Sequence, residues 1–134
     1  MWPEDEQHPD LFSTLDDLPP IERPLTVAQR FEQFHAENPL VERHMIRIAR
    51  EWRGEFPGSK VGVNGLIEHV RWRVALATSD PDFKINNIFG PFYSRLIAFD
   101  APDLTDAFHF RKSIADEWIK DWAARHTHHG ERAA

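Results

Sequence analysis

Apolar side chains recur at helical spacing through residues 64–77, near the middle of the chain. One face of the helix that they predict carries Ile67, Val70, Val74 and Ala77. Trp72 and Leu76 lie on a second side, and Arg71 and Arg73 bracket the tryptophan. A Ser-Asp-Pro-Asp turn follows and ends this central helix. The two arginines indicate either an edge that faces a partner or the rim of a core helix.

Capping and proline signals divide the rest of the chain into short helices. Thr26 and Gln29 form a capping-box pattern, so the first helix is expected to begin there. Asn38 and Pro39 suit the cap and the first turn of a second helix, and Pro91 suits the first turn of a later one. The predicted helices span about residues 27–37, 39–53, 64–78, 91–99, 102–110 and 114–123. Because there is no repeat and no run of strands, the sequence predicts an all-α fold, a compact helix-turn-helix-like bundle of five to six short helices with at most a small β element.

Two of these helices carry polar side chains whose direction matters for function. In the predicted helix 91–99, we expect Tyr93 and Arg95 to point outward, because they do not share the stripe formed by Phe92, Leu96 and Phe99. In the predicted helix 39–53, a basic stripe is formed by Arg43, Arg47 and Arg50. Such a stripe is usually solvated and paired with nearby acids, here Glu42 and Glu51. Contact with phosphate is the alternative.

The two ends of the chain differ from the middle. Residues 1–24 combine five prolines with seven acids and one arginine, which predicts a disordered acidic N-terminal tail. A sharper hypothesis is that this segment folds back onto the basic middle of the chain and competes with a polyanion, with Leu11, Phe12 and Leu15 docked in a groove. The helical domain is expected to span residues 25–123, and residues 124–134 are expected to be a frayed C-terminal tail.

Composition and charge narrow the class of protein. The chain has 134 residues, enough for one domain, and no cysteine, which excludes disulfides and thiolate metal sites. Its net charge is −6, which argues against a protein that coats nucleic acid indiscriminately. Residues 25–99 nevertheless hold ten bases and eight acids, a net of +2. The sequence has neither a secretory signal nor an apolar run long enough for a membrane span, so we expect a soluble, cytoplasmic protein.

Basic and amide side chains gather in the central third of the chain. The candidate nucleic-acid-binding residues are Lys60, Arg71, Arg73, Lys84, Asn86, Asn87, Tyr93 and Arg95. Asparagine and arginine can read base edges, and lysine and tyrosine can reach phosphates. The pattern therefore suggests a helix-turn-helix-like basic face that binds double-stranded DNA. The alternatives are that the asparagines cap turns and that Arg71 and Arg73 form ion pairs with Glu68 or another acid.

Signals for an enzyme are weak. Asp82 and Lys84 match an acid-x-Lys element of metal-dependent nucleases, but a turn is the wrong place for it. Zinc-binding histidine spacing, a phosphate-binding glycine loop and a nucleophile elbow are all missing from the sequence. We therefore expect no enzyme activity, no cofactor and no metal.

Aromatic residues support a third hypothesis, a protein-binding module. The chain has 5 Trp and 10 Phe, more than a small helical core obviously needs. An exposed aromatic patch is one possible use of Trp52, Trp72, Trp118 and Trp122, and filling the core is the other. A homodimer through the last helix is equally compatible with the pattern.

Several segments resemble a family of small uncharacterised proteins of phages and prophages. The resemblance rests on residues 34–39 (FHAENP), 67–72 (IEHVRW), 82–87 (DFKINN) and 93–96 (YSRL). It continues weakly through Pro102-Asp103-Leu104 and residues 108–111. The resemblance implies a phage or mobile-element setting, in the cytoplasm of a bacterial host. It favours a DNA-binding or regulatory protein, or alternatively a protein that binds and inhibits a host protein through an aromatic or acidic surface.

Overall fold

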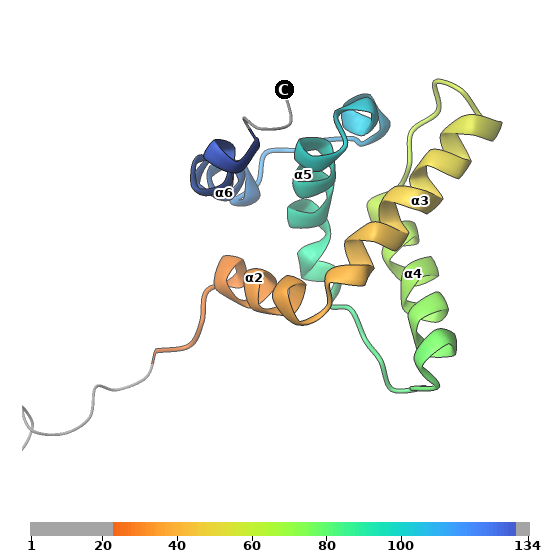
Figure 1. The fold of residues 1–134 in the computed structure, drawn as a ribbon, viewed down its shortest axis with the longest axis horizontal. Helices are drawn as coiled ribbons and strands as arrows, with labels where there is room; N and C mark the ends of the chain where they lie inside the picture. The colour runs from red at the N-terminus through yellow and green to blue at the C-terminus, as the bar shows by residue number, and fades with distance from the viewer. Residues whose placement is uncertain (1–22, 131–134) are drawn as a thin grey trace, which may run out of the picture.

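The helices of the computed structural model follow the predicted order closely (Figure 1). The structure describes residues 23–130, with side chains through residue 127. This part contains α2 (Val27–Glu37), α3 (Pro39–Glu55), α4 (Val63–Thr78), the 3-10 helix η1 (Asn87–Phe89), α5 (Gly90–Asp100), the 3-10 helix η2 (Pro102–Ala107) and α6 (Ala115–Gly130). Residues 23–130 hold no strand, so the small β element that the sequence left open is not formed there. The predicted all-α bundle of short helices is confirmed.

Local capping explains where the first helices begin and end. The Thr26 side chain accepts a hydrogen bond from the Gln29 backbone at 3.1 Å, and the Gln29 side chain accepts one from the Thr26 backbone at 2.9 Å. This is the predicted capping box of α2. Asn38 is the N-cap residue of α3, as predicted, but its side chain makes no capping bond to that helix. It donates instead to the Phe34 carbonyl at 3.0 Å and so closes α2. Pro39 occupies the first turn of α3, as expected.

Helix α5 is the centre of the molecule, with α6 on one side and the α3–α4 pair on the other (Figure 1). Six consecutive residues are buried, from Phe92 to Ile97. The expectation that Tyr93 and Arg95 point outward was therefore wrong. A helix enclosed on all sides has no solvent face, so its polar residues lie inside with the apolar ones.

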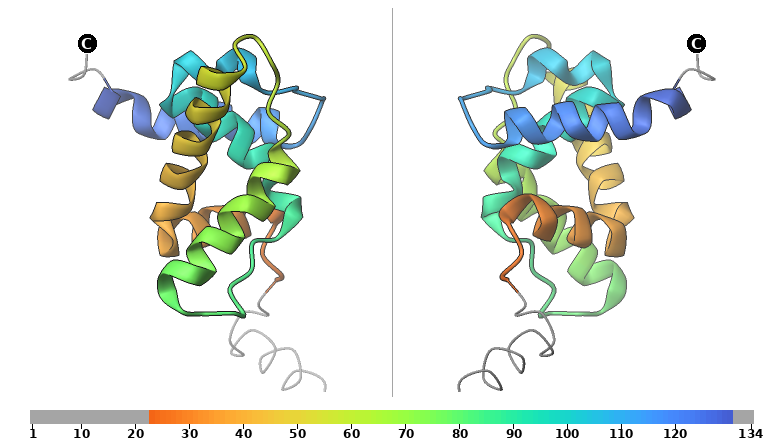
Figure 2. Two further views of the ribbon diagram at one scale, coloured as in Figure 1. Left: turned by 90° about the vertical axis from the view of Figure 1, so that its right-hand side faces the viewer. Right: turned by 90° about the vertical axis from the view of Figure 1, so that its left-hand side faces the viewer.

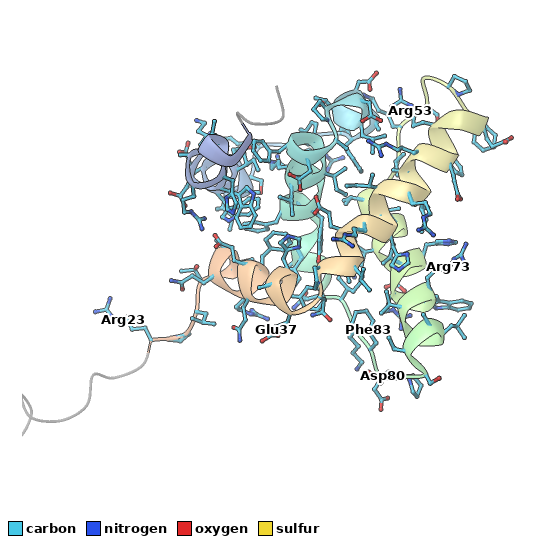
Figure 3. All side chains as sticks on the ribbon, viewed as in Figure 1. Arg23, Glu37, Arg53, Arg73, Asp80 and Phe83 are labelled. Atoms are coloured by element: carbon cyan, nitrogen blue, oxygen red, sulfur yellow. The ribbon has the colours of Figure 1, made fainter. Side chains whose placement is uncertain are left out.

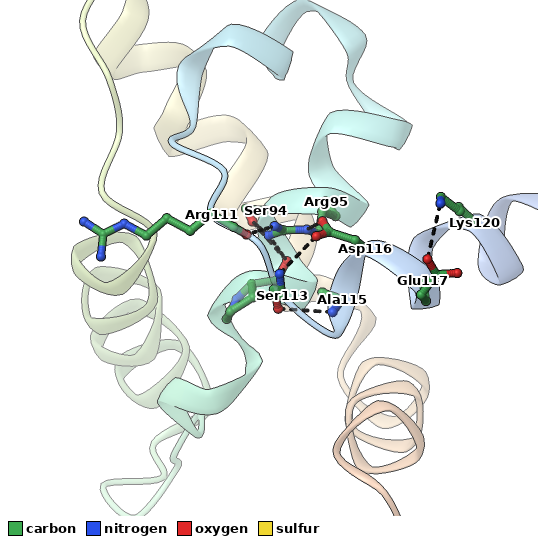
Figure 4. A network of polar contacts seen from close by, with 9 residues as sticks. Ser94, Arg95, Arg111, Ser113, Ala115, Asp116, Glu117 and Lys120 are labelled. Carbon is green, nitrogen blue, oxygen red and sulfur yellow. Dashed lines mark hydrogen bonds and ion pairs between the residues drawn. The ribbon is translucent and has the colours of Figure 1, made fainter.

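Arg95 is buried because its guanidinium finds partners in the connection to α6 (Figure 4). It donates to the Asp116 carboxylate at 2.8 Å, to the Pro91 carbonyl at 3.0 Å and to the Arg111 carbonyl. Asp116 also accepts from the Ser113 backbone at 3.0 Å, and the Ser113 hydroxyl accepts from the Ala115 backbone at 3.1 Å. These bonds hold the chain at the start of α6.

An aromatic cluster around Phe31 joins α2 to α5 and α6. The Phe31 ring is fully buried and meets Tyr93 edge-on at 4.7 Å and Trp118 edge-on at 5.1 Å between ring centroids. Phe89 and Phe92 complete the contacts at 5.6 and 5.4 Å. Such edge-to-face pairs add to the hydrophobic gain from burial. The hypothesis that Trp118 forms an exposed patch was therefore wrong, and it fills the core.

The C-terminal helix is longer than expected. Helix α6 runs across one side of the bundle and continues to Gly130, so the predicted fraying from residue 124 was wrong as far as residue 130 (Figure 2). Glu32 of α2 accepts from Arg125 at 2.9 Å and from the Trp118 indole at 2.8 Å. These contacts hold the far end of α6 against α2. The helix predicted over residues 102–110 is instead the shorter η2. Residues 1–22 of the predicted acidic tail lie outside the part of the chain that the structure describes.

Candidate functional site

The predicted nucleic-acid-binding residues do not form one open face. Tyr93 and Arg95 are buried in α5, so neither can reach a phosphate or a base. Arg71 is half-buried and forms an ion pair with Glu68 at 3.1 Å, which is the alternative foreseen from the sequence. Lys60 is exposed but donates to the Asp106 carbonyl at 2.7 Å. Half of the eight candidates are therefore engaged within the fold.

The other four candidates lie at two separate places. Lys84, Asn86 and Asn87 are exposed on the segment that enters η1. The Asn86 side chain accepts from the Ile88 backbone at 3.0 Å, so it caps η1 as the alternative interpretation expected. Arg73 is exposed on α4 and projects from its outer side (Figure 3). The cations of this set therefore do not converge on one surface, as a DNA-binding face requires.

The outer face of α4 carries large apolar side chains in solvent. Trp72 is 66% exposed and Leu76 is 77% exposed, while Ile67 and Val70 on the opposite side of the same helix are fully buried. We define the α4 outer face as Gly65, Glu68, His69, Trp72, Arg73 and Leu76, which line one shallow depression. Their spacing follows one helical stripe. This helix is therefore apolar on two sides, and only one side is used by the core.

A groove between α3 and α4 continues this face. Its lining includes Trp52 of α3, and it shares Gly65 and His69 with the α4 outer face. A Cβ atom at Gly65 would have nothing within 4 Å, so the glycine leaves open space where the two depressions meet. The left view of Figure 2 shows α3 and α4 together on this side of the molecule.

The groove wall is held in place by local contacts. The Trp52 indole donates to the Ser59 hydroxyl at 2.8 Å, and that hydroxyl donates to the Phe56 carbonyl at 2.7 Å. The Trp52 and Phe56 rings lie 4.6 Å apart, and both side chains are about half exposed. An exposed aromatic surface that is already ordered needs little rearrangement when it binds.

The arginines of α3 and α4 differ in how they are paired. Arg50 forms an ion pair with Asp103 of η2 at 2.9 Å and Arg53 one with Asp106 at 3.2 Å, so the expected pairing of Arg50 with a glutamate of its own helix was wrong. Arg47 and Arg73 are exposed and have no ion-pair partner among the described residues. Among the residues that line the two depressions, the arginines and lysines are Arg73 and Lys60.

A buried polar cluster is formed by side chains of α2, α3 and α5, and it was not predicted from the sequence. Glu42 is 7% exposed, and burial, reinforced by Asp100, raises its pKa to about 9. The His35 imidazole lies 4.0 Å from the Glu42 carboxyl, and burial lowers its pKa. Burial also raises the pKa of the Tyr93 hydroxyl. All three groups are therefore uncharged near neutral pH.

This cluster has unused hydrogen-bonding capacity. His35 Nδ1, Glu42 Oε2 and Tyr93 Oη have no hydrogen-bond partner within the described part of the chain. Glu42 was expected to pair with surface arginines, and that expectation was wrong because its side chain turns inward. The only sequence signal was the place of His35 on the apolar edge of the first helix. These three atoms are shielded from solvent, so the cluster bears on stability more than on ligand binding.

Comparisons with known proteins do not extend this description. The chain matches no protein-family model, no curated protein and no solved structure. The phage-family resemblance therefore remains a prediction. Within residues 23–127, no three His, Asp or Glu side chains are placed to hold a metal ion. Likewise, none of the described helices has the length and apolar character needed to cross a membrane.

Proposed function

We propose that this domain is a protein-binding module that docks a partner protein on the α4 outer face. The observation that carries the proposal is the exposure of Trp72 and Leu76, one helical turn apart on the same stripe. Large apolar side chains that a fold leaves in solvent as a group mark interaction sites. In the setting that the resemblance implies, the partner is a protein of the bacterial host, whose activity the bound domain would block.

The composition of the face supports a protein partner. Tryptophan and arginine are the residues most enriched among interface hot spots, and Trp72 and Arg73 are neighbours here. The stripe from Gly65 to Leu76 lies on a single rigid helix, which suits packing against a helix or groove of the partner. Because the opposite side of α4 is fixed in the core, binding would cost little conformational entropy.

The same observations give less support to DNA binding. Protein–DNA affinity comes largely from phosphate contacts, which need several cations on one surface. On the α4 outer face, Arg73 is the one arginine or lysine, and Glu68 lies beside it. The full chain also carries a net charge of −6, which opposes association with a polyanion.

A capture experiment with matched variants tests the proposal. The full-length chain is immobilised, exposed to a bacterial lysate, and compared with the double variants W72A/L76A and L40A/I114A. Leu40 and Ile114 are also more than half exposed but belong to α3 and to the segment before α6, so the second variant loses apolar surface outside α4. We expect a partner that is retained by the native chain and by L40A/I114A and lost by W72A/L76A. Equal retention by all three chains, or by none, contradicts the proposal.

A further inference from the structure

A second surface lies at the start of the described chain, between α2 and the segment 84–89. Its floor is apolar and is formed by Phe34, Ile85 and Phe89. Its rim carries the exposed cations Arg30 and Lys84, and Glu37 lies at the far end. The groove is open to solvent along its length and has a volume of about 700 Å³.

The chain itself enters this groove. Leu25 is one of the lining residues, and only Arg23 and Pro24 separate it from residue 22. Three extended residues span at most about 11 Å, so residue 22 stays within that distance of Leu25. Figure 3 labels Arg23, where the described chain begins, and Glu37 at the other end of α2.

The residues just before this point match the groove in chemistry. The stretch 15–22 reads Leu-Asp-Asp-Leu-Pro-Pro-Ile-Glu. It offers three acids to the two cations on the rim and three aliphatic side chains to the aromatic floor. Its two prolines restrict the free chain, which lowers the entropy lost on docking in an aromatic-lined groove.

We propose that residues 15–22 dock in the groove between α2 and segment 84–89 of their own chain. Tethering replaces a bimolecular encounter by an intramolecular one, with an effective concentration of about millimolar for a short connection. Contacts that are weak in an isolated peptide therefore suffice to hold the segment. Arg30 and Lys84 position the segment by attracting its acidic side chains, and the apolar floor of the groove supplies most of the contact area.

Because the chain has no cysteine, a single nitroxide spin label can be placed by substitution. The label is attached to S13C in the otherwise native full-length chain, and paramagnetic broadening of backbone amide signals is measured. Docking predicts selective loss of signal at residues 30–37 and 84–89. The substitution R30E/K84E should remove this selective loss, whereas R43E/R47E, a matched reversal of two exposed arginines on α3, should preserve it.

Other outcomes overturn the proposal. A segment that merely samples the surface gives the same broadening in all three chains. Strongest broadening at the α4 outer face places the segment there instead. The last measurement uses a mixture of spin-labelled chains and isotope-enriched chains that carry no label. Broadening of amide signals in the unlabelled chains would show that the segment docks on a second copy. Thermal unfolding of R30E/K84E checks that the fold is intact, as expected for two exposed side chains.

Discussion

Replacing the buried Glu42 with glutamine should change how stability depends on pH. Burial among Asp100, His35 and Tyr93 raises the pKa of the Glu42 carboxyl from 4.5 to about 9. The folded protein therefore keeps a proton that the unfolded chain releases above pH 4.5. Below pH 4.5 both states hold the proton and nothing is lost. As the pH rises from 4.5 toward 9, the free energy of unfolding falls.

The size of this loss in the free energy of unfolding follows from the difference between the Glu42 pKa in the unfolded chain and in the folded protein. Each pH unit in this interval costs about 1.4 kcal/mol, so the cumulative loss at pH 7 is about 3 kcal/mol. His35 has the opposite effect on stability, and at lower pH. Because its pKa is lowered in the folded state, the unfolded state binds a proton more readily below pH 6.5, and the free energy of unfolding falls as the pH decreases. The range above pH 6.5 therefore reports on Glu42 without the histidine.

Urea unfolding followed by tryptophan fluorescence measures the effect. The native chain and the control E55Q, an exposed glutamate of the same helix, should lose about 1.4 kcal/mol for each unit of pH above about 6.5. The E42Q variant is uncharged at every pH and close in shape, so its stability should stay nearly level over the same range. Parallel profiles for E42Q and the native chain would refute the argument that Glu42 is buried as a neutral acid.

Two further substitutions test the packing around α5. R95A should lower the free energy of unfolding by about 3 kcal/mol, because it leaves Asp116 and two carbonyls without their buried donor. The exposed Arg73 gives the control, and R73A should change stability by less than about 0.5 kcal/mol. F31A should cost about 3–5 kcal/mol, because it opens a cavity against Tyr93 and Trp118. Denaturant unfolding of each chain checks these values, and an R95A effect as small as that of R73A would contradict the buried network.

Helix positions could be predicted well because their signals are local. The capping box at Thr26 and the first-turn prolines Pro39 and Pro91 need only a few neighbouring residues to act. Periodicity likewise identified the buried side of α4 through Ile67 and Val70. These features depend on backbone hydrogen bonds and helical spacing, which the sequence carries directly.

The directions of several polar side chains could not be predicted in the same way. Arg95 and Tyr93 break the apolar stripe of α5, yet they are buried because partners from distant segments surround that helix. Glu42 has arginines nearby in sequence but faces the core, and it does so as a neutral acid. Tertiary contacts decided these cases, and periodicity within one helix does not contain them.

The exposure of Trp72 and Leu76 on the α4 outer face could not be predicted from the sequence either. The sequence placed Trp72 and Leu76 apart from the core stripe, but it left open whether a second helix covers them. In the structure α3 packs against α4 and leaves both residues exposed. An exposed apolar pair can be recognised only once the neighbours of its helix are known.

The affinity of a captured partner for the native chain and its variants tests the central claim most directly. Once a protein is retained by the native chain, its dissociation constant is measured by titration against purified native, W72A/L76A and L40A/I114A chains. Loss of one hot-spot tryptophan alone costs about 2 kcal/mol or more, so W72A/L76A should bind about 30-fold more weakly or worse. The control L40A/I114A should bind like the native chain. Equal affinity of all three chains would contradict docking on the α4 outer face.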